Sequence, residues 1–350
     1  SIAIFGQGRA ILKLYDYAHP NKIQACFIVI LLASILTIPV SAYVDPDLYI
    51  LVFFVVLINC LHTGTSAAAR ATRDLRRFFK LRASLVFLRL ILIFSSVFIG
   101  ESIEWYLIAE LIAPIFSLSI AGYGRKKLGT IKRFDIKNLR EPVFIGFPMF
   151  LTAVNAVLIL HYDKILLVKE IEMSLLGNYF FMSSLAASIA FVTAFHAIKY
   201  ESSIYQSAFV NEAVNKTRLF IKKCVGGYIL IFPALLLVIY STKLIDTGPN
   251  IDFKVFLMLL VGNCFMGCSA GYTYLMTYFG KTHYVYYCSV AVAIISIGAN
   301  NIMIPKFQIF GAGLTILMSG IIGFLINAMV ARKLLSLEHV RNKVAGAKDK

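Results

Sequence analysis

Four ionisable side chains lie inside long apolar stretches of this sequence. They are Arg89 in LVFLRLILIF, Glu110 in WYLIAELIAP, and the adjacent Asp163 and Lys164 in LILHYDKILL. A charge within a bilayer is costly, so each group needs a partner, a change of protonation or a water-filled cavity. A carboxylate in such a place can carry a proton or an alkali cation, and a guanidinium or ammonium group can hold an anion. These residue types indicate ion transfer and anion binding.

Arg89 and Glu110 fall on consecutive apolar stretches, which we expect to run antiparallel. By the helical rise, Arg89 lies roughly 10 Å from the cytoplasmic end of its helix. It therefore either snorkels to that surface, pairs within the bundle, or lines a cavity. Glu110 either faces the bundle or is protonated. Its role stays open between a proton relay, a partner of Arg89 and an interfacial carboxylate.

Asp163 and Lys164 lie roughly 10 Å below the outer end of their helix. Adjacent helical residues point about 100° apart, so we do not expect the two side chains to pair directly. Thr152, Asn155, Tyr162 and Asp163 form one broad polar stripe. The stripe either faces an aqueous cavity or makes hydrogen bonds to another helix.

The sequence lacks the motifs of common enzyme classes, since it contains no H-E-x-x-H, G-x-S-x-G or P-loop pattern. His62, His196 and the six cysteines lie in or beside apolar stretches, where packing roles are expected. The segment from Gly6 to Arg9 is too short for a nucleotide fingerprint, although glycines beside an arginine at a helix end can bind phosphate. We therefore expect no enzyme, no catalytic residue, no metal and no cofactor, apart from a coupled H⁺ or Na⁺ ion.

The elements that position these residues are transmembrane helices. Hydrophobic residues make up 59% of the 350 residues and charged residues 15%, far from the balance of soluble domains. A bilayer core takes roughly 20 apolar residues per helix. We expect an all-α, polytopic helix bundle of about ten spans: 23–44, 47–69, 83–100, 103–122, 142–168, 174–198, 219–241, 253–279, 284–304 and 308–331.

The net charge of +16 is concentrated in a few short loops between these spans. Alternate loops are rich and poor in Lys and Arg, which is the positive-inside pattern and argues against nucleic-acid binding. Both termini are then cytoplasmic. The basic loop near 123–141 divides an N-terminal lobe of four spans (1–141) from a C-terminal lobe of six (142–335), followed by a basic tail (336–350). A two-lobe 6+6 transporter lacking its first two helices would give this arrangement.

Several short motifs resemble those of the O-antigen flippases, within the superfamily that includes the multidrug and toxin exporters. The similar residues are Pro148-Met-Phe150, Asp163-Lys-Ile165 and Gly177-Asn-Tyr179, then IPKFQIFGAG with Pro305, Gly311 and Gly313. The family pattern I-P-x-x-G-x-x-G-A departs here, because Gln308 and Ile309 lie around its first glycine. The likeness is diffuse but covers essentially the whole chain.

This resemblance implies alternating-access flipping of a polyprenyl-pyrophosphate-linked oligosaccharide across the bacterial inner membrane, for O-antigen, lipopolysaccharide or other surface polysaccharide biosynthesis. The implied partners are membrane lipid, the lipid-linked oligosaccharide and other polysaccharide assembly proteins. By position we assign Arg89, Lys164, Asn155, Tyr162 and Arg9 to the cargo cavity. Asp163 and Glu110 are the candidates for ion or proton coupling, and Pro148, Pro305, Gly311 and Gly313 are candidates for hinges or close packing.

Two alternatives remain open. An ion-coupled multidrug exporter of the same superfamily would favour an acidic, aromatic cavity, whereas Arg89 and Lys164 favour an anionic cargo. A multi-span membrane acyltransferase would need a histidine base near the membrane face, and neither His19 nor His62 has such a setting.

Overall fold

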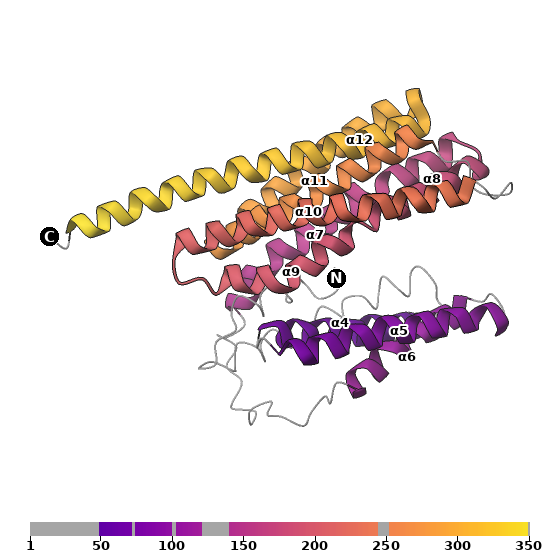
Figure 1. The fold of residues 1–350 in the computed structure, drawn as a ribbon, viewed down its shortest axis with the longest axis horizontal. Helices are drawn as coiled ribbons and strands as arrows, with labels where there is room; N and C mark the ends of the chain where they lie inside the picture. The colour runs from indigo at the N-terminus through magenta and orange to yellow at the C-terminus, as the bar shows by residue number, and fades with distance from the viewer. Residues whose placement is uncertain (1–48, 72–73, 100–102, 121–139, 244–251, 349–350) are drawn as a thin grey trace. The chain divides into compact units, whose positions relative to one another are not determined.

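The computed structural model describes residues 49–71, 74–99, 103–120, 140–243 and 252–348, and every regular element in these ranges is helical (Figure 1). The all-α fold class is therefore confirmed. Arg9 and the predicted span 23–44 lie outside the described residues. The chain divides into two compact units, Ser1–Ala153 and Val154–Lys350. The lobe boundary proposed from loop charge, between residues 141 and 142, stays a prediction.

The described part of the first unit contains α4 (Tyr49–Ala71), α5 (Leu75–Ile99) and α6 (Ile103–Ile120), each of which contacts the other two. Small and aliphatic side chains fill the space between them, including Leu81, Leu85, Ala109 and Ala113. Alanines at the contact let helix backbones approach closely. These three helices match the predicted spans 47–69, 83–100 and 103–122.

The first unit continues into α7 (Arg140–Glu170), and the second contains α8 (Met173–Ala187), α9 (Ala190–Tyr205), α10 (Val210–Lys243), α11 (Phe253–Tyr278) and α12 (Thr282–Lys348). The helices α8 and α9 replace the single predicted span 174–198. The break is slight, because Ser188 and Ile189 keep helical backbone angles. The Ser188 hydroxyl donates to the Leu185 carbonyl at 2.6 Å, which competes with the helix's own hydrogen bonds.

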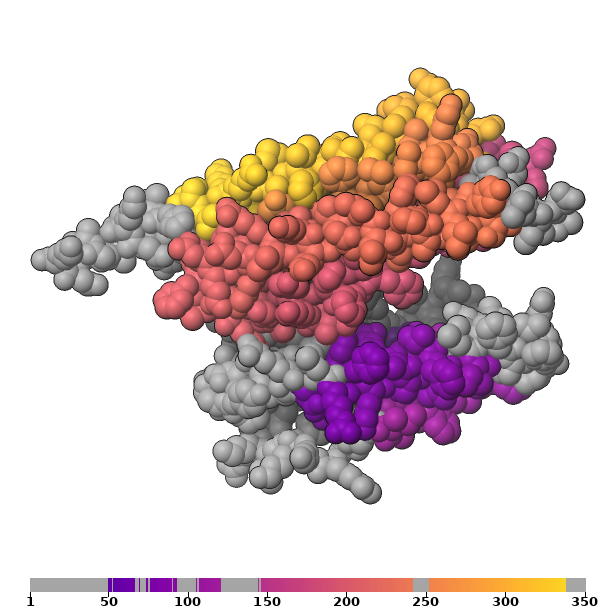
Figure 2. Space-filling model, viewed as in Figure 1, coloured from indigo at the N-terminus to yellow at the C-terminus, as the bar shows by residue number. Residues whose placement is uncertain are grey.

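Five helical segments of the described chain are long and apolar enough to cross a membrane: 146–170, 173–205, 210–241, 253–278 and 282–337. On α10, which lies on the visible face of the second unit in Figure 2, Ile229, Leu230 and Leu237 are strongly exposed. Exposed aliphatic rows of this kind suit contact with lipid. The predicted span 219–241 thus has the apolar surface expected of it.

The long helix α12 is two antiparallel helices joined by a sharp reversal at Gln308, where φ is 48° and ψ is −125°. A side chain at Gly311 would meet the Met303 carbonyl, and one at Gly323 would meet Val292, so the second half returns along the first. The two halves correspond to the predicted spans 284–304 and 308–331. Gln308 is the only described residue other than glycine with positive φ, and it occupies the position of the first glycine in the I-P-x-x-G motif.

The two glycines Gly262 and Gly320 bring α11 and the second half of α12 into backbone contact. A β-carbon at Gly262 would lie 2.7 Å from the Ile316 carbonyl oxygen, and one at Gly320 would meet the Gly262 carbonyl. Neither obstacle is a flexible side-chain end. The contact therefore requires glycine at both positions.

We expect Gln308→Gly to stabilise the protein by about 1 kcal/mol, because a left-handed conformation strains any residue with a β-carbon. The thermal midpoint of the purified protein in detergent measures the effect. Gln308→Ala keeps the β-carbon and is the matched control, for which no gain is expected. An equal gain in both variants would show that the side chain, and not the backbone angle, is unfavourable.

We expect Gly262→Ala to destabilise the protein by about 1–3 kcal/mol, because the added methyl group overlaps a backbone carbonyl. Gly298→Ala is the control, since a β-carbon there meets nothing within 4 Å and alanine favours a helix. Thermal unfolding in detergent compares the two. Loss of stability in both variants to the same extent would contradict the close contact.

Candidate functional site

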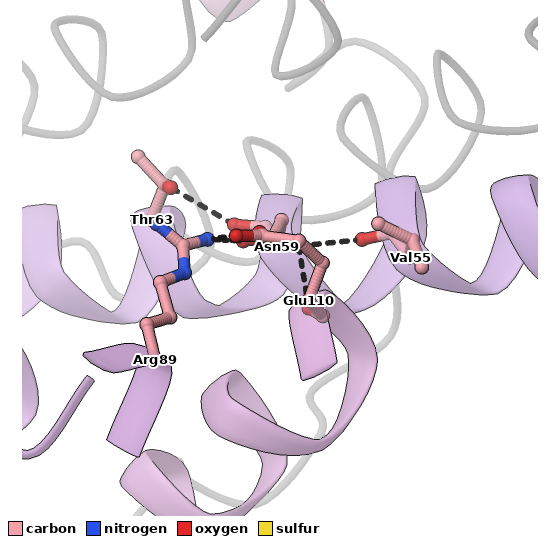
Figure 3. A network of polar contacts seen from close by, with 5 residues as sticks. All are labelled: Val55, Asn59, Thr63, Arg89 and Glu110. Atoms are coloured by element: carbon pink, nitrogen blue, oxygen red, sulfur yellow. Dashed lines mark hydrogen bonds and ion pairs between the residues drawn. The ribbon is translucent and has the colours of Figure 1, made fainter. Parts of the chain in front are cut away.

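A charged network joins the three described helices α4, α5 and α6 of the first unit (Figure 3). Arg89 Nη2 on α5 donates to Glu110 Oε2 on α6 at 2.6 Å and to Asn59 Oδ1 on α4 at 2.7 Å. Asn59 Nδ2 donates to the carbonyls of Glu110, at 3.1 Å, and Val55, at 2.9 Å. Of the alternatives for Arg89, the geometry favours pairing within the bundle. Its charge is balanced by a carboxylate.

Asn59 was not among the residues singled out in the sequence. An asparagine within the apolar run VVLINCL needs hydrogen-bond partners, as the charged residues do. Thr63 extends the network, since its hydroxyl donates to the Asn59 carbonyl at 2.9 Å. Side-chain exposure is 32% for Arg89 and 17% for Glu110. The network is therefore partly shielded, and part of the Arg89 side chain stays exposed.

A second polar layer lies toward the other end of the same three helices. His62 is 1% exposed, and its Nε2 contacts the Ser117 hydroxyl at 3.0 Å and the Leu81 carbonyl at 3.3 Å. A carbonyl only accepts hydrogen bonds, so Nε2 carries the proton. The Ser84 hydroxyl reaches Ser117 at 3.0 Å. His62 is thus a satisfied packing histidine, in agreement with the sequence expectation.

In the second unit Asp163 on α7 is completely buried. One carboxyl oxygen, Oδ2, accepts a hydrogen bond from the hydroxyl of Tyr179 on α8, which is also completely buried. The other, Oδ1, has no hydrogen-bond partner among the described residues and lies 3.7 Å from Lys164 Nζ. The expectation that Asp163 and Lys164 do not pair was wrong, because the long lysine chain folds back, with Nζ donating to the Leu160 carbonyl at 2.8 Å.

Tyr179 was not predicted from the sequence to be the partner of Asp163. A signal existed, because Tyr179 ends the Gly177-Asn-Tyr179 motif and Asp163 begins the Asp-Lys-Ile motif. The structure joins these two motifs by one hydrogen bond between α7 and α8. The family resemblance therefore identified both motifs, but it did not predict the hydrogen bond between them.

The polar stripe expected on α7 divides between two neighbours. Asn155 donates to the Ser289 hydroxyl on α12 at 2.9 Å, and Tyr162 exchanges hydrogen bonds of 3.3 and 3.2 Å with Asn301. Asp163 instead reaches α8. For Asn155 and Tyr162, helix-to-helix bonding is the alternative that the geometry supports. The Thr152 hydroxyl donates to the Pro148 carbonyl of its own helix.

Ser296 and Asn300 are completely buried on α12. They lie on one helix face with Val292, which packs with Ile159 of α7. Ser296 Oγ and both amide atoms of Asn300 have no hydrogen-bond partner within the described chain. Buried polar atoms without partners are uncommon and tend to mark functional positions.

The positions assigned to hinges and close packing are placed as follows. Pro148 and Pro305 lie inside α7 and α12. Gly311 lies against the Met303 backbone, and a β-carbon at Gly313 would be 3.3 Å from Val255 on α11. In the part of the chain that the structure describes, no three His, Cys, Asp or Glu side chains gather in a way that could hold a metal ion.

Comparison with known proteins finds likeness in structure alone. No family model matches the chain, and no curated protein sequence matches it. Among solved structures, a variant of the Vibrio cholerae MATE transporter VcmN aligns with a TM-score of 0.69 at 16% identity, covering 96% of this chain and 84% of that one. An outward-facing multidrug resistance MATE family transporter of the MOP superfamily aligns with a TM-score of 0.70 at 12% identity and the same coverage. The chain therefore has a MATE-like fold.

We expect Tyr179→Phe to cost about 1.5–3 kcal/mol, the usual range for a hydrogen bond to a charged group, because it leaves a buried carboxyl group without its donor. Tyr162→Phe removes the same atom from a bond to a neutral, exposed amide and should cost about 1 kcal/mol or less. Thermal unfolding of both variants in detergent gives the comparison. Equal losses would mean that the hydrogen bond to Asp163 contributes no more to stability than the hydrogen bond to Asn301.

Proposed function

We propose that the chain is a secondary transporter that works by alternating access and couples transport to H⁺ or Na⁺ at Asp163. The premise is the fold, which it shares with MATE transporters. The observation that carries the proposal is the environment of Asp163, a completely buried carboxyl group whose Oδ1 has no hydrogen-bond partner among the described residues. An ionisable group at such depth in an apolar helix is typical of an ion or proton pathway.

Tyr179 and Lys164 give this site two states. With Asp163 ionised, the Tyr179 hydroxyl and the Lys164 ammonium group stabilise the carboxylate. With a proton or a small cation on Oδ1, the attraction to Lys164 weakens while the Tyr179 bond can persist at Oδ2. The carboxylate oxygens of Asp163 are ligands of the kind that hard cations prefer.

For the cargo, the reading that fits best is export of amphipathic organic compounds, as by a multidrug exporter. One of the structural neighbours is a multidrug resistance MATE family transporter. The charge argument for an anionic cargo is weaker than the sequence suggested, because Arg89 lies against Glu110 and Lys164 against Asp163. Neither assigned cation offers an unbalanced positive charge.

Flipping of a polyprenyl-linked oligosaccharide is the second candidate, and one observation favours it. The reversal at Gln308, with its positive φ, falls where the flippase motif has its first glycine, and Gly311 makes the close contact behind it. The motif thus coincides with a specific backbone geometry. The inner-membrane location, the cytoplasmic termini and the polysaccharide assembly partners belong to this candidate.

An acyltransferase role gains no support from the setting of His62. His62 is buried, and its Nε2 is held by Ser117 and the Leu81 carbonyl, which leaves that nitrogen no access to a substrate. We propose no catalytic residue.

In proteoliposomes, Asp163→Asn should reduce transport driven by an imposed H⁺ or Na⁺ gradient by about tenfold or more, since the amide cannot exchange a proton or balance a cation. Glu170→Gln, at the exposed end of the same helix, is the matched control and should transport normally. Normal gradient-driven transport by Asp163→Asn at every pH would remove this residue as the coupling site.

Deletion of the gene separates the two cargo candidates. Increased sensitivity to cationic dyes with normal surface glycan supports the exporter. Loss of surface glycan with normal dye sensitivity supports the flippase.

A further inference from the structure

The Arg89 guanidinium has hydrogen-bond donors that its partners in the network do not use. Its bonds to Glu110 and Asn59 both come from one nitrogen, Nη2, whereas arginine and a carboxylate often pair through two parallel bonds. Nε is buried and has no partner among the residues that the structure describes. The guanidinium is therefore fixed in place by Glu110 and Asn59 but is incompletely satisfied. About one third of the Arg89 side chain is exposed.

The negative charge of the Glu110 carboxylate balances the positive charge of Arg89. If the carboxylate takes up a proton, it no longer balances the guanidinium charge, and an anion can approach Nη2 in its place. Asn59 holds the guanidinium through Oδ1, and its own Nδ2 is anchored on two backbone carbonyls. The cation therefore keeps its position when Glu110 changes charge.

We propose that Arg89, Asn59 and Glu110 form an anion-binding site that opens when Glu110 is protonated. The ligand class is a tetrahedral oxyanion, such as a phosphate or sulfate group, which matches the fork of the guanidinium. Asn59 is a positioning residue in this site. The site lies within the first unit and is independent of Asp163.

Other charged groups near Glu110 do not replace Arg89. On α5, Arg82 Nε is bound to the Ser66 hydroxyl at 3.1 Å. On α4, His62 lies within electrostatic reach of both Arg82 and Arg89, but its Nε2 is held by Ser117 and Leu81. Cys60 is buried beside Asn59 on α4. Of these groups, only Glu110 is bonded to the arginine.

Sulfate is a suitable probe because it stays a dianion across the working pH range, so that only the protein titrates. The chain has a single tryptophan, Trp105, which lies on α6 five positions before Glu110. Its fluorescence reports binding at this site in the purified full chain in detergent. Titrations at fixed ionic strength between pH 8 and pH 5 give the dissociation constant.

Glu110→Gln, which mimics the protonated carboxyl group, should bind sulfate at pH 8 about tenfold or more tightly than wild type, given the strength of hydrogen bonds to charged groups. The double variant Arg89→Gln with Glu110→Gln should not bind, and it leaves no uncompensated charge that would prevent folding. Glu212→Gln, which removes a carboxylate paired with Lys216 at 2.6 Å in the second unit, is the matched control and should behave as wild type.

Sulfate binding that is the same in wild type and Glu110→Gln at every pH overturns the proposal, as does binding by the double variant equal to that of Glu110→Gln. Either result would mean that the network only holds the three helices together. Neither result bears on coupling at Asp163, which transport measures separately.

Discussion

The requirement that every charge in a medium of low dielectric find a partner accounts for much of the helix packing in this protein. Arg89 on α5 reaches both Glu110 on α6 and Asn59 on α4, so one guanidinium sets the lateral register of three helices. Asp163 and Tyr179 do the same for α7 and α8. Small and apolar side chains fix how closely helices approach, and many of them tolerate exchange for others of similar volume. The polar contacts do not, and they select one register from several.

The two units meet this requirement to different degrees. In the first, the carboxylate and the guanidinium balance each other at 2.6 Å. In the second, Asp163 has a neutral donor on one oxygen and an ammonium group only at 3.7 Å from the other. Incomplete compensation of a buried carboxyl group is a property of coupling sites more than of structural ones. This difference is why the proposed coupling lies at Asp163 and not at Glu110.

The helices could be predicted from the sequence because apolar length is a property of each segment alone. The predicted spans from 47–69 to 308–331 all have helical counterparts, including the two halves of α12. The contacts between helices were harder to predict, because the partner of a side chain depends on which faces of two helices meet. Charge made Arg89 and Glu110 visible as a possible pair, whereas Asn59 and Tyr179 are neutral and did not stand out. The polar stripe on α7 was found, but its division between α8 and α12 required the packing.

The helix α7 has a mechanical consequence for the molecule. Its 31 residues run without interruption across the division between the two units, which falls at Ala153. Pro148 lies one turn and a half before that point and has no N–H group, so the Phe144 carbonyl lacks the usual helical donor. A helix that lacks one of its main-chain hydrogen bonds bends more easily at that place, so α7 bends more easily beside Pro148 than along its uninterrupted turns.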